Sequence, residues 1–95
     1  MTIAIVATIQ AKPDHHTDVL AALHAVIPPS RAEAACLEYG LWADPAVPGK
    51  WVMLERWQDQ AGLTQHMASA HFQALTQALN GRVDSVQIDQ LQPAC

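Results

Sequence analysis

The chain has 95 residues, of which 51% are hydrophobic and 15% charged, and its formal net charge at pH 7 is −4. This length predicts a single domain, residues 1–95. Only 5 residues are Lys or Arg, which argues against nucleic-acid binding because phosphate recognition needs a clustered basic surface. The apolar content argues against disorder. In so small a chain it also indicates that part of the apolar surface meets another subunit.

The N-terminal residues and the cysteines bear on where the protein resides. The segment MTIAIVATI lacks the positive leader and the cleavage pattern of a signal peptide. No apolar run approaches the ~20 residues of a membrane-spanning helix. Cys36 and Cys95 lie far apart without CxxC spacing. Because a secreted disulfide scaffold of this length usually carries more cysteines, we expect two free thiols in a reducing cytoplasm.

The first half of the chain predicts a strand followed by a helix. β-Branched residues alternate over residues 2–10 with both faces apolar as far as Thr8, which predicts a central strand. Lys12-Pro13-Asp14 is typical of a helix start, and Pro28-Pro29 predicts the end of that helix. Residues 30–33, Ser-Arg-Ala-Glu, match a capping box, which predicts a short second helical turn. The helix has one apolar stripe, formed by Val19, Leu20, Leu23, Val26 and Ile27.

The second half predicts a hairpin, two short helices and a last strand. Alternation predicts strands over residues 36–43 and 50–58, with the turn between them at Asp44-Pro45 and Pro48-Gly49. Asp59 and Ser69 are placed to cap two helices, which end near Met67 and at Gly81. The second of these helices has a buried stripe of Phe72, Leu75, Ala78 and Leu79. The last strand contains Val83, Val86 and Ile88.

This order of elements, β–α–β–β–α–β, predicts an α+β fold of the ferredoxin-like type. Such a fold has a four-stranded antiparallel sheet with its helices on one face. The opposite face of the predicted sheet also carries apolar side chains. The same face of a second copy, related by a two-fold axis, would cover them, so we expect a homodimer.

Four segments of the sequence together resemble the antibiotic biosynthesis monooxygenase family, and in particular its small quinol monooxygenase members. These segments are Glu33 to Tyr39, Leu54-Glu55-Arg56-Trp57, His66, and Ser69-Ala70-His71-Phe72. The family pattern has a Glu-x-Gly-Cys-x-x-Tyr segment, a strand ending Glu-x-Trp, a helix ending in His, and then Ser-x-His-Phe. The resemblance covers nearly the whole chain, with Ala35 standing where the family generally has Gly.

The resemblance implies a dimeric α+β barrel in which two subunits join through their sheets. It also implies a cleft between sheet and helices that receives flat, oxidisable aromatics such as quinols. Family members with monooxygenase activity work without flavin, haem or metal, so we expect no cofactor. The family also contains relatives that degrade haem or isomerise a small sugar-derived signal, so membership says more about fold than about reaction.

His66 and His71 are the candidate catalytic residues. A neutral imidazole can remove a phenolic proton and return it later, and a quinol anion reduces O₂ more readily than the neutral quinol. In the alternative interpretation, one histidine only fixes the strand–helix junction by hydrogen-bonding Glu55 or a helix-end carbonyl. The two histidines and Glu55 also have the residue types of a two-His, one-carboxylate iron site. The spacing does not require that site, so no metal is predicted.

Glu55, on the predicted strand face of Trp57, is expected to be partly buried and to need a partner. His66, His71 and Arg31 are the candidate partners. Two interpretations stay open: a structural ion pair, which we favour, and an orienting group for a catalytic histidine.

The aromatic residues are candidates for lining a flat pocket. Tyr39 carries a hydroxyl that a substrate oxygen could bind. Trp57, Phe72 and Glu55 are further substrate-binding candidates, although the two aromatic residues also suit core packing, as aromatic residues usually do. Cys36 lies in a strand without an adjacent base, which predicts an unreactive thiol.

The leading hypothesis is cofactor-independent oxygenation of a quinol-like or polyphenolic aromatic. His66, helped by His71, would take the hydroxyl proton while Tyr39 orients the ring oxygen. The first alternative is an acid–base isomerase of a small hydroxyketone. The second is a dimeric small-molecule-binding or stress-associated module without enzymatic activity. Haem degradation ranks lowest, because residues 73–80 contain no histidine to ligate iron.

Overall fold

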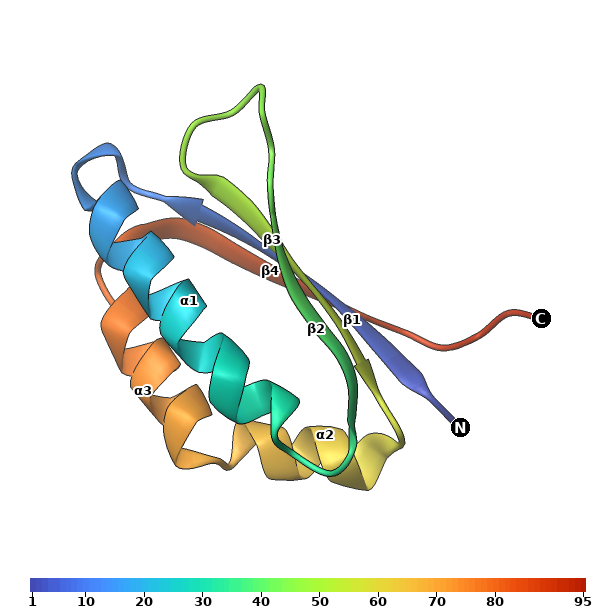
Figure 1. Ribbon diagram of the computed structural model, residues 1–95. Helices are drawn as coiled ribbons and strands as arrows, with labels where there is room; N and C mark the ends of the chain where they lie inside the picture. The colour runs from blue at the N-terminus through green and yellow to red at the C-terminus, as the bar shows by residue number, and fades with distance from the viewer.

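The computed structural model describes residues 1–95, with all helices packed on one side of a single sheet (Figure 1). The strands pair antiparallel in the order β2-β3-β1-β4, which confirms the predicted ferredoxin-like fold. No helix is long and apolar enough to cross a membrane. The elements are β1 (Ile3–Ala11), a 3₁₀ turn η1 (Pro13–His15), α1 (His16–Arg31), β2 (Cys36–Ala43), β3 (Lys50–Trp57), α2 (Gln60–Met67), α3 (Ala70–Leu79) and β4 (Val83–Leu91).

The helix-facing side of the sheet holds the core. Alternate residues of β1 are buried while those between them are half-buried, so β1 turns one face fully toward the helices. The register between β1 and β3 places Ala7 beside Met53 and Ile3 beside Trp57 on that face. α1 and α3 lie across it (Figure 1), and α1 contributes three buried apolar side chains, Val19, Leu23 and Val26. The predicted apolar stripe of the first helix is therefore confirmed as its core face.

The opposite side of the sheet carries no helix (Figure 1). We call this side the outer face; its central residues are Ala4, Val6 and Thr8 of β1 and Val52 and Leu54 of β3, all half-buried. On β2, Trp42 is 62% exposed, and the register places it beside Val52. The second apolar face expected from the sequence is therefore present, and within this chain nothing covers it.

The first helix is longer than the sequence predicts. α1 continues through Pro28 and Pro29 and ends at Arg31. A proline ring holds φ near the helical value, so each proline here removes one hydrogen bond without forcing the chain out of the helix. The amide of Ala32 still donates to the carbonyl of Pro28. The predicted capping box is consequently wrong: Ser30 is a buried residue inside α1, and the predicted second helical turn does not form.

The two predicted caps in the second half are confirmed. The Asp59 carboxylate accepts a hydrogen bond from the Gly62 amide at the start of α2. The Ser69 hydroxyl accepts one from the Phe72 amide at the start of α3. Each satisfies an amide that has no partner within its own helix. Beyond α3, Gly81 adopts φ +77° and turns the chain into β4.

α2 approaches the start of β2 closely because Gly62 has no side chain. A Cβ added at Gly62 would overlap the Cβ of Ala35. Ala35 is the residue that departs from the family pattern, and no residue other than glycine has a positive φ. Alanine is therefore accommodated in this turn without backbone strain, with the neighbouring glycine leaving the space for it.

This contact predicts a compensating pair of substitutions. We expect Gly62→Ala to lower the free energy of unfolding by about 1–3 kcal/mol, because the new methyl group overlaps Ala35. In the Ala35→Gly background the same change should cost little, since the opposing methyl group is gone. Urea denaturation of the four members of this double-mutant cycle measures the coupling. Equal effects of Gly62→Ala in both backgrounds would contradict the contact.

Candidate active site

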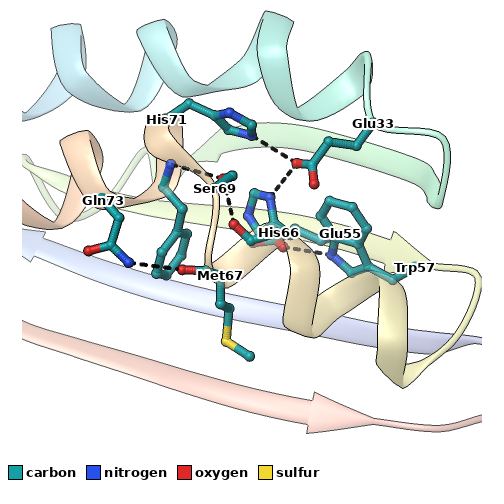
Figure 2. Close-up of polar contacts among 9 residues, drawn as sticks. Glu33, Glu55, Trp57, His66, Met67, Ser69, His71 and Gln73 are labelled. Carbon is teal, nitrogen blue, oxygen red and sulfur yellow. Dashed lines mark hydrogen bonds and ion pairs between the residues drawn. The ribbon is translucent and has the colours of Figure 1, made fainter.

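A single carboxylate joins the two candidate histidines. Glu33 lies in the turn after α1, His66 near the end of α2 and His71 in the first turn of α3. One oxygen of Glu33, Oε2, lies 2.6 Å from Nδ1 of His66 and 2.8 Å from Nε2 of His71 (Figure 2). Ser69 holds the junction between the two helices, because its hydroxyl caps α3 and also donates to the carbonyl of His66. This junction places the two imidazoles on the same carboxylate oxygen.

The contact with Glu33 determines which nitrogen of His66 is free. A carboxylate only accepts hydrogen bonds, so Nδ1 of His66 carries the hydrogen and the neutral ring keeps its lone pair on Nε2. Nε2 is buried and has no hydrogen-bond partner in the protein. Burial lowers the pKa of His66 below its ordinary value of 6.5, although Glu33 opposes this shift. At pH 7, His66 is therefore a neutral base with an unoccupied acceptor atom.

Aromatic rings surround His66. Its ring centroid lies 4.4 Å from that of Trp57, 5.2 Å from that of Phe72 and 5.5 Å from that of Tyr39. The Trp57 ring is the most nearly parallel to the imidazole, at 33°, and its side chain is 0% exposed. These aromatic residues, drawn from three segments of the sequence, hold the imidazole in one orientation and exclude water from it.

A pocket of about 800 Å³ lies between the sheet and the helices, and 13 of its 20 lining residues are hydrophobic. Tyr39, Glu55, His66 and Phe72, four of the six candidate site residues, line it. Trp57 and His71 do not. Trp57 packs beneath His66 and His71 lies on the far side of Glu33, so neither is placed to touch a ligand in this pocket. An apolar pocket with few polar groups is the usual form of a small-molecule site.

Glu55 has none of the three partners expected from the sequence. Both histidines bind Glu33 instead, and Arg31 donates from Nε to the carbonyl of Tyr39. Glu55 forms no ion pair; its Oε1 accepts a hydrogen bond from Nε1 of Trp57 at 3.0 Å. Both interpretations of Glu55 predicted from the sequence, the structural ion pair and the histidine-orienting group, are therefore wrong. Burial without a cation raises the pKa of Glu55 to about 7.

Glu33 is not among the site residues predicted from the sequence, although it is the first residue of the Glu33 to Tyr39 segment. Its spacing of three from Ser30 suggested a helix cap, and that local interpretation hid the long-range one. One sequence signal could have identified Glu33 as a site residue: it begins a segment that matches the family pattern.

Glu33, His66 and His71 are also the residues that could hold a metal ion. Their ligand atoms lie within 4.8 Å of one another, whereas Glu55 is not part of the group. Both imidazoles already donate to the same carboxylate oxygen. A metal ion would have to displace the two protons and both hydrogen bonds, and the observed distances are those of hydrogen bonds.

Comparison with known proteins identifies the scaffold. The sequence model of the family described as antibiotic biosynthesis monooxygenase matches residues 2–78. The chain belongs to this family. The match spans the first three strands, α1, α2 and all of α3 except its last residue, and therefore includes every residue of the histidine–glutamate group.

Individual family members resemble the chain over most of its length. YcnE of Bacillus subtilis (strain 168), a candidate monooxygenase, is 34% identical over 71 residues, 75% of each chain. YgiN of Escherichia coli (strain K12), described as a probable quinol monooxygenase, is 30% identical over an alignment of 101 positions, gaps included, that covers 96% of this chain and 97% of YgiN. The crystal structure of PA3566 from Pseudomonas aeruginosa superimposes with a TM-score of 0.94 at 35% identity and covers 99% of this chain and 95% of its own.

The raised pKa of Glu55 predicts a pH-dependent stability difference. Between 4.5, its ordinary pKa, and about 7, the folded chain retains a proton that the unfolded chain has released. The free energy of unfolding therefore falls as pH rises through this interval. Glu55→Gln removes that loss, so the variant should match the parent at pH 4.5 and exceed its stability by about 3 kcal/mol at pH 8.

Urea denaturation at several pH values measures this difference. Comparing variant with parent cancels the opposite slope that His66 contributes, because its lowered pKa makes stability rise with pH in both proteins. Glu38→Gln is the matched control, since Glu38 is an exposed carboxylate paired with Arg56. A constant difference between Glu55→Gln and parent from pH 4.5 to 8 would contradict the burial of an unpaired carboxyl.

The Glu33 contact predicts the tautomer of His66. We expect nitrogen NMR shifts to show the Nδ1–H form in the parent protein at pH 7.5. Glu33→Ala should shift the population toward Nε2–H, because the acceptor that holds the proton on Nδ1 is lost. His24, which is exposed on α1, serves as an internal reference in the same spectra. A tautomer unchanged by Glu33→Ala would show that Glu33 does not orient the ring.

Proposed function

We propose that this protein is a cofactor-independent monooxygenase that acts on a quinol or polyphenolic aromatic in the pocket between sheet and helices. The observation that carries this proposal is Nε2 of His66: a buried, unpartnered acceptor on a neutral imidazole, in a residue that lines an apolar pocket. Family membership supports the reaction class, and the description of YgiN as a probable quinol monooxygenase supports the substrate class.

The first step is proton removal. Nε2 of His66 takes the hydrogen of a substrate hydroxyl and leaves a quinolate, while the imidazolium that forms lies 2.6 Å from the Glu33 carboxylate. That carboxylate stabilises the charged ring without taking a proton itself. His71 is a positioning residue in this scheme, because its hydrogen bond holds the shared oxygen of Glu33 in place.

The second step is the reaction with oxygen. The quinolate gives one electron to O₂, and the semiquinone and superoxide recombine to form a C–O bond. Loss of water then leaves a hydroxylated quinone. One quinol and one O₂ give one hydroxyquinone and one H₂O, so the substrate supplies both electrons and no other reductant is required. The apolar pocket favours this step because it keeps water from the anion.

Tyr39 and Phe72 position the ring. Phe72 lines the pocket next to His66 and offers a flat apolar surface. The Tyr39 hydroxyl is a hydrogen-bond donor for a ring oxygen; burial and the Glu55 carboxyl raise the pKa of Tyr39, so it stays protonated over the working pH range.

We also infer a homodimer joined through the outer face. The half-buried apolar residues of β1 and β3 and the exposed Trp42 form one surface on the side of the sheet that carries no helix. A two-fold axis brings this surface against itself and buries it on both copies. The active pocket lies on the helix side, so each subunit would carry its own.

Oxygen uptake tests the proposal. With a naphthohydroquinone as substrate, we expect His66→Ala to lower kcat by at least about 100-fold relative to the parent, after subtraction of autoxidation. His24→Ala, on the exposed side of α1, should leave the rate unchanged. In the parent, kcat/KM should fall as pH drops through the lowered pKa of His66, because the base becomes protonated.

Three outcomes contradict this function. Unchanged uptake in a folded His66→Ala variant removes the imidazole from the mechanism. Turnover of a hydroxyketone without oxygen consumption establishes the isomerase alternative. Tight binding of aromatics without oxygenation or isomerisation indicates a binding module without enzymatic activity.

A further inference from the structure

We infer that Glu55 is a second recognition group of the pocket, donating a hydrogen bond from its carboxyl to a carbonyl or ring oxygen of the ligand. This inference rests on the proposed function and narrows its substrate class. The pocket would recognise an aromatic with two oxygens, one donating its hydrogen to His66 and the other accepting from Glu55. A quinol meets this requirement, and so does the hydroxylated quinone that the proposed reaction forms. A quinone without a hydroxyl group can use only the Glu55 donor.

The hydrogen bond with Trp57 determines where the proton of Glu55 lies. An indole N–H can only donate, so Oε1 of Glu55 must act as the acceptor at 3.0 Å. When the carboxyl is neutral, its hydrogen therefore sits on Oε2, which has no hydrogen-bond partner in the protein. Because the Trp57 ring is fully buried and stacks on His66, it holds Glu55 beside His66. Figure 2 shows the hydrogen bond between Glu55 and Trp57, with the Trp57 ring beside that of His66.

Glu55 forms no ion pair. The neighbouring cation is Arg31 at the end of α1, which acts on Cys36 and donates from Nε to the carbonyl of Tyr39. The titratable groups around it are Glu33 after α1, Cys36 and Tyr39 on β2, and the two histidines of α2 and α3 that bind Glu33. Glu55 is 7% exposed, and the negative charge of Glu33 opposes its ionisation further. A substantial fraction of Glu55 molecules therefore keep the carboxyl hydrogen near neutral pH.

Glu55 and His66 thus present complementary groups to one pocket: a donor on the sheet and an acceptor on the helix. Acid–base sites commonly pair two titratable groups whose environments shift their pKa values apart. A neutral Glu55 carboxyl can donate its hydrogen to a quinone oxygen. An ionised carboxylate would instead place its lone pairs against those of the quinone oxygen and repel it.

Calorimetric binding of 2,3-dimethyl-1,4-naphthoquinone tests this role. This quinone has two acceptor oxygens and no ring position open to thiol addition. In the parent protein, we expect affinity to fall about tenfold from pH 6.5 to pH 8.5, as Glu55 loses its hydrogen. The window lies above the lowered pKa of His66 and below the raised pKa values of Cys36 and Tyr39.

Two variants separate the donor from the shape of the side chain. Glu55→Gln keeps a donor at every pH, because Trp57 binds the amide oxygen and the NH₂ group faces the pocket; its affinity should be that of the parent at pH 6.5 and independent of pH. Glu55→Leu has no donor and should bind the quinone about tenfold more weakly at pH 6.5. Circular dichroism establishes that both variants fold. The hydrocarbon 2,3-dimethylnaphthalene should bind all three proteins equally.

The inference is overturned if Glu55→Leu binds the quinone as well as the parent does at pH 6.5, or if the pH dependence persists in Glu55→Gln. These measurements require no turnover. If the quinone binds as expected but the protein does not oxygenate quinols, the recognition role of Glu55 holds and the proposed function fails. If the protein oxygenates quinols but quinone binding does not depend on Glu55, only the recognition role fails.

Discussion

The Glu33 carboxylate is the contact on which the site depends. One of its oxygens accepts hydrogen bonds from two imidazoles that lie 33 and 38 residues further along the chain. It thereby connects the turn after α1 with both α2 and α3. Because it holds the hydrogen of His66 on Nδ1, it also leaves Nε2 as the acceptor at the pocket. A structural role and a chemical role are thus met by the same atom.

Burial has opposite effects on the two titratable groups that matter most. Desolvation penalises the charged form of any group, so it lowers the pKa of His66 and raises that of Glu55. Both shifts favour neutral side chains near pH 7. An apolar pocket can therefore contain one acceptor and one donor without a buried unpaired charge, which would be costly in free energy.

The fold explains why this chemistry sits where it does. The ferredoxin-like topology places all helices on one side of the sheet, and the pocket forms between the two layers. The β3 strand presents Glu55 and Trp57 to that side, two residues apart, as strand alternation requires. Family membership accounts for the scaffold, whereas the proposed reaction rests on the side chains that this particular chain places along the pocket.

What the sequence by itself determined was local. Alternation located the strands, Asp59 and Ser69 located two helix starts, and a series of short segments indicated the family, because each of these signals depends on residues a few positions apart. The sequence also selected His66, Tyr39 and Phe72, which do meet around one pocket. The tertiary structure alone decided their partners. Glu33 rather than Glu55 binds the histidines, Trp57 packs beneath the pocket wall, and α1 passes through two prolines. The contact between Glu33 and the histidines depends on how a turn directs a side chain toward residues more than 30 positions away, and no local pattern records that direction.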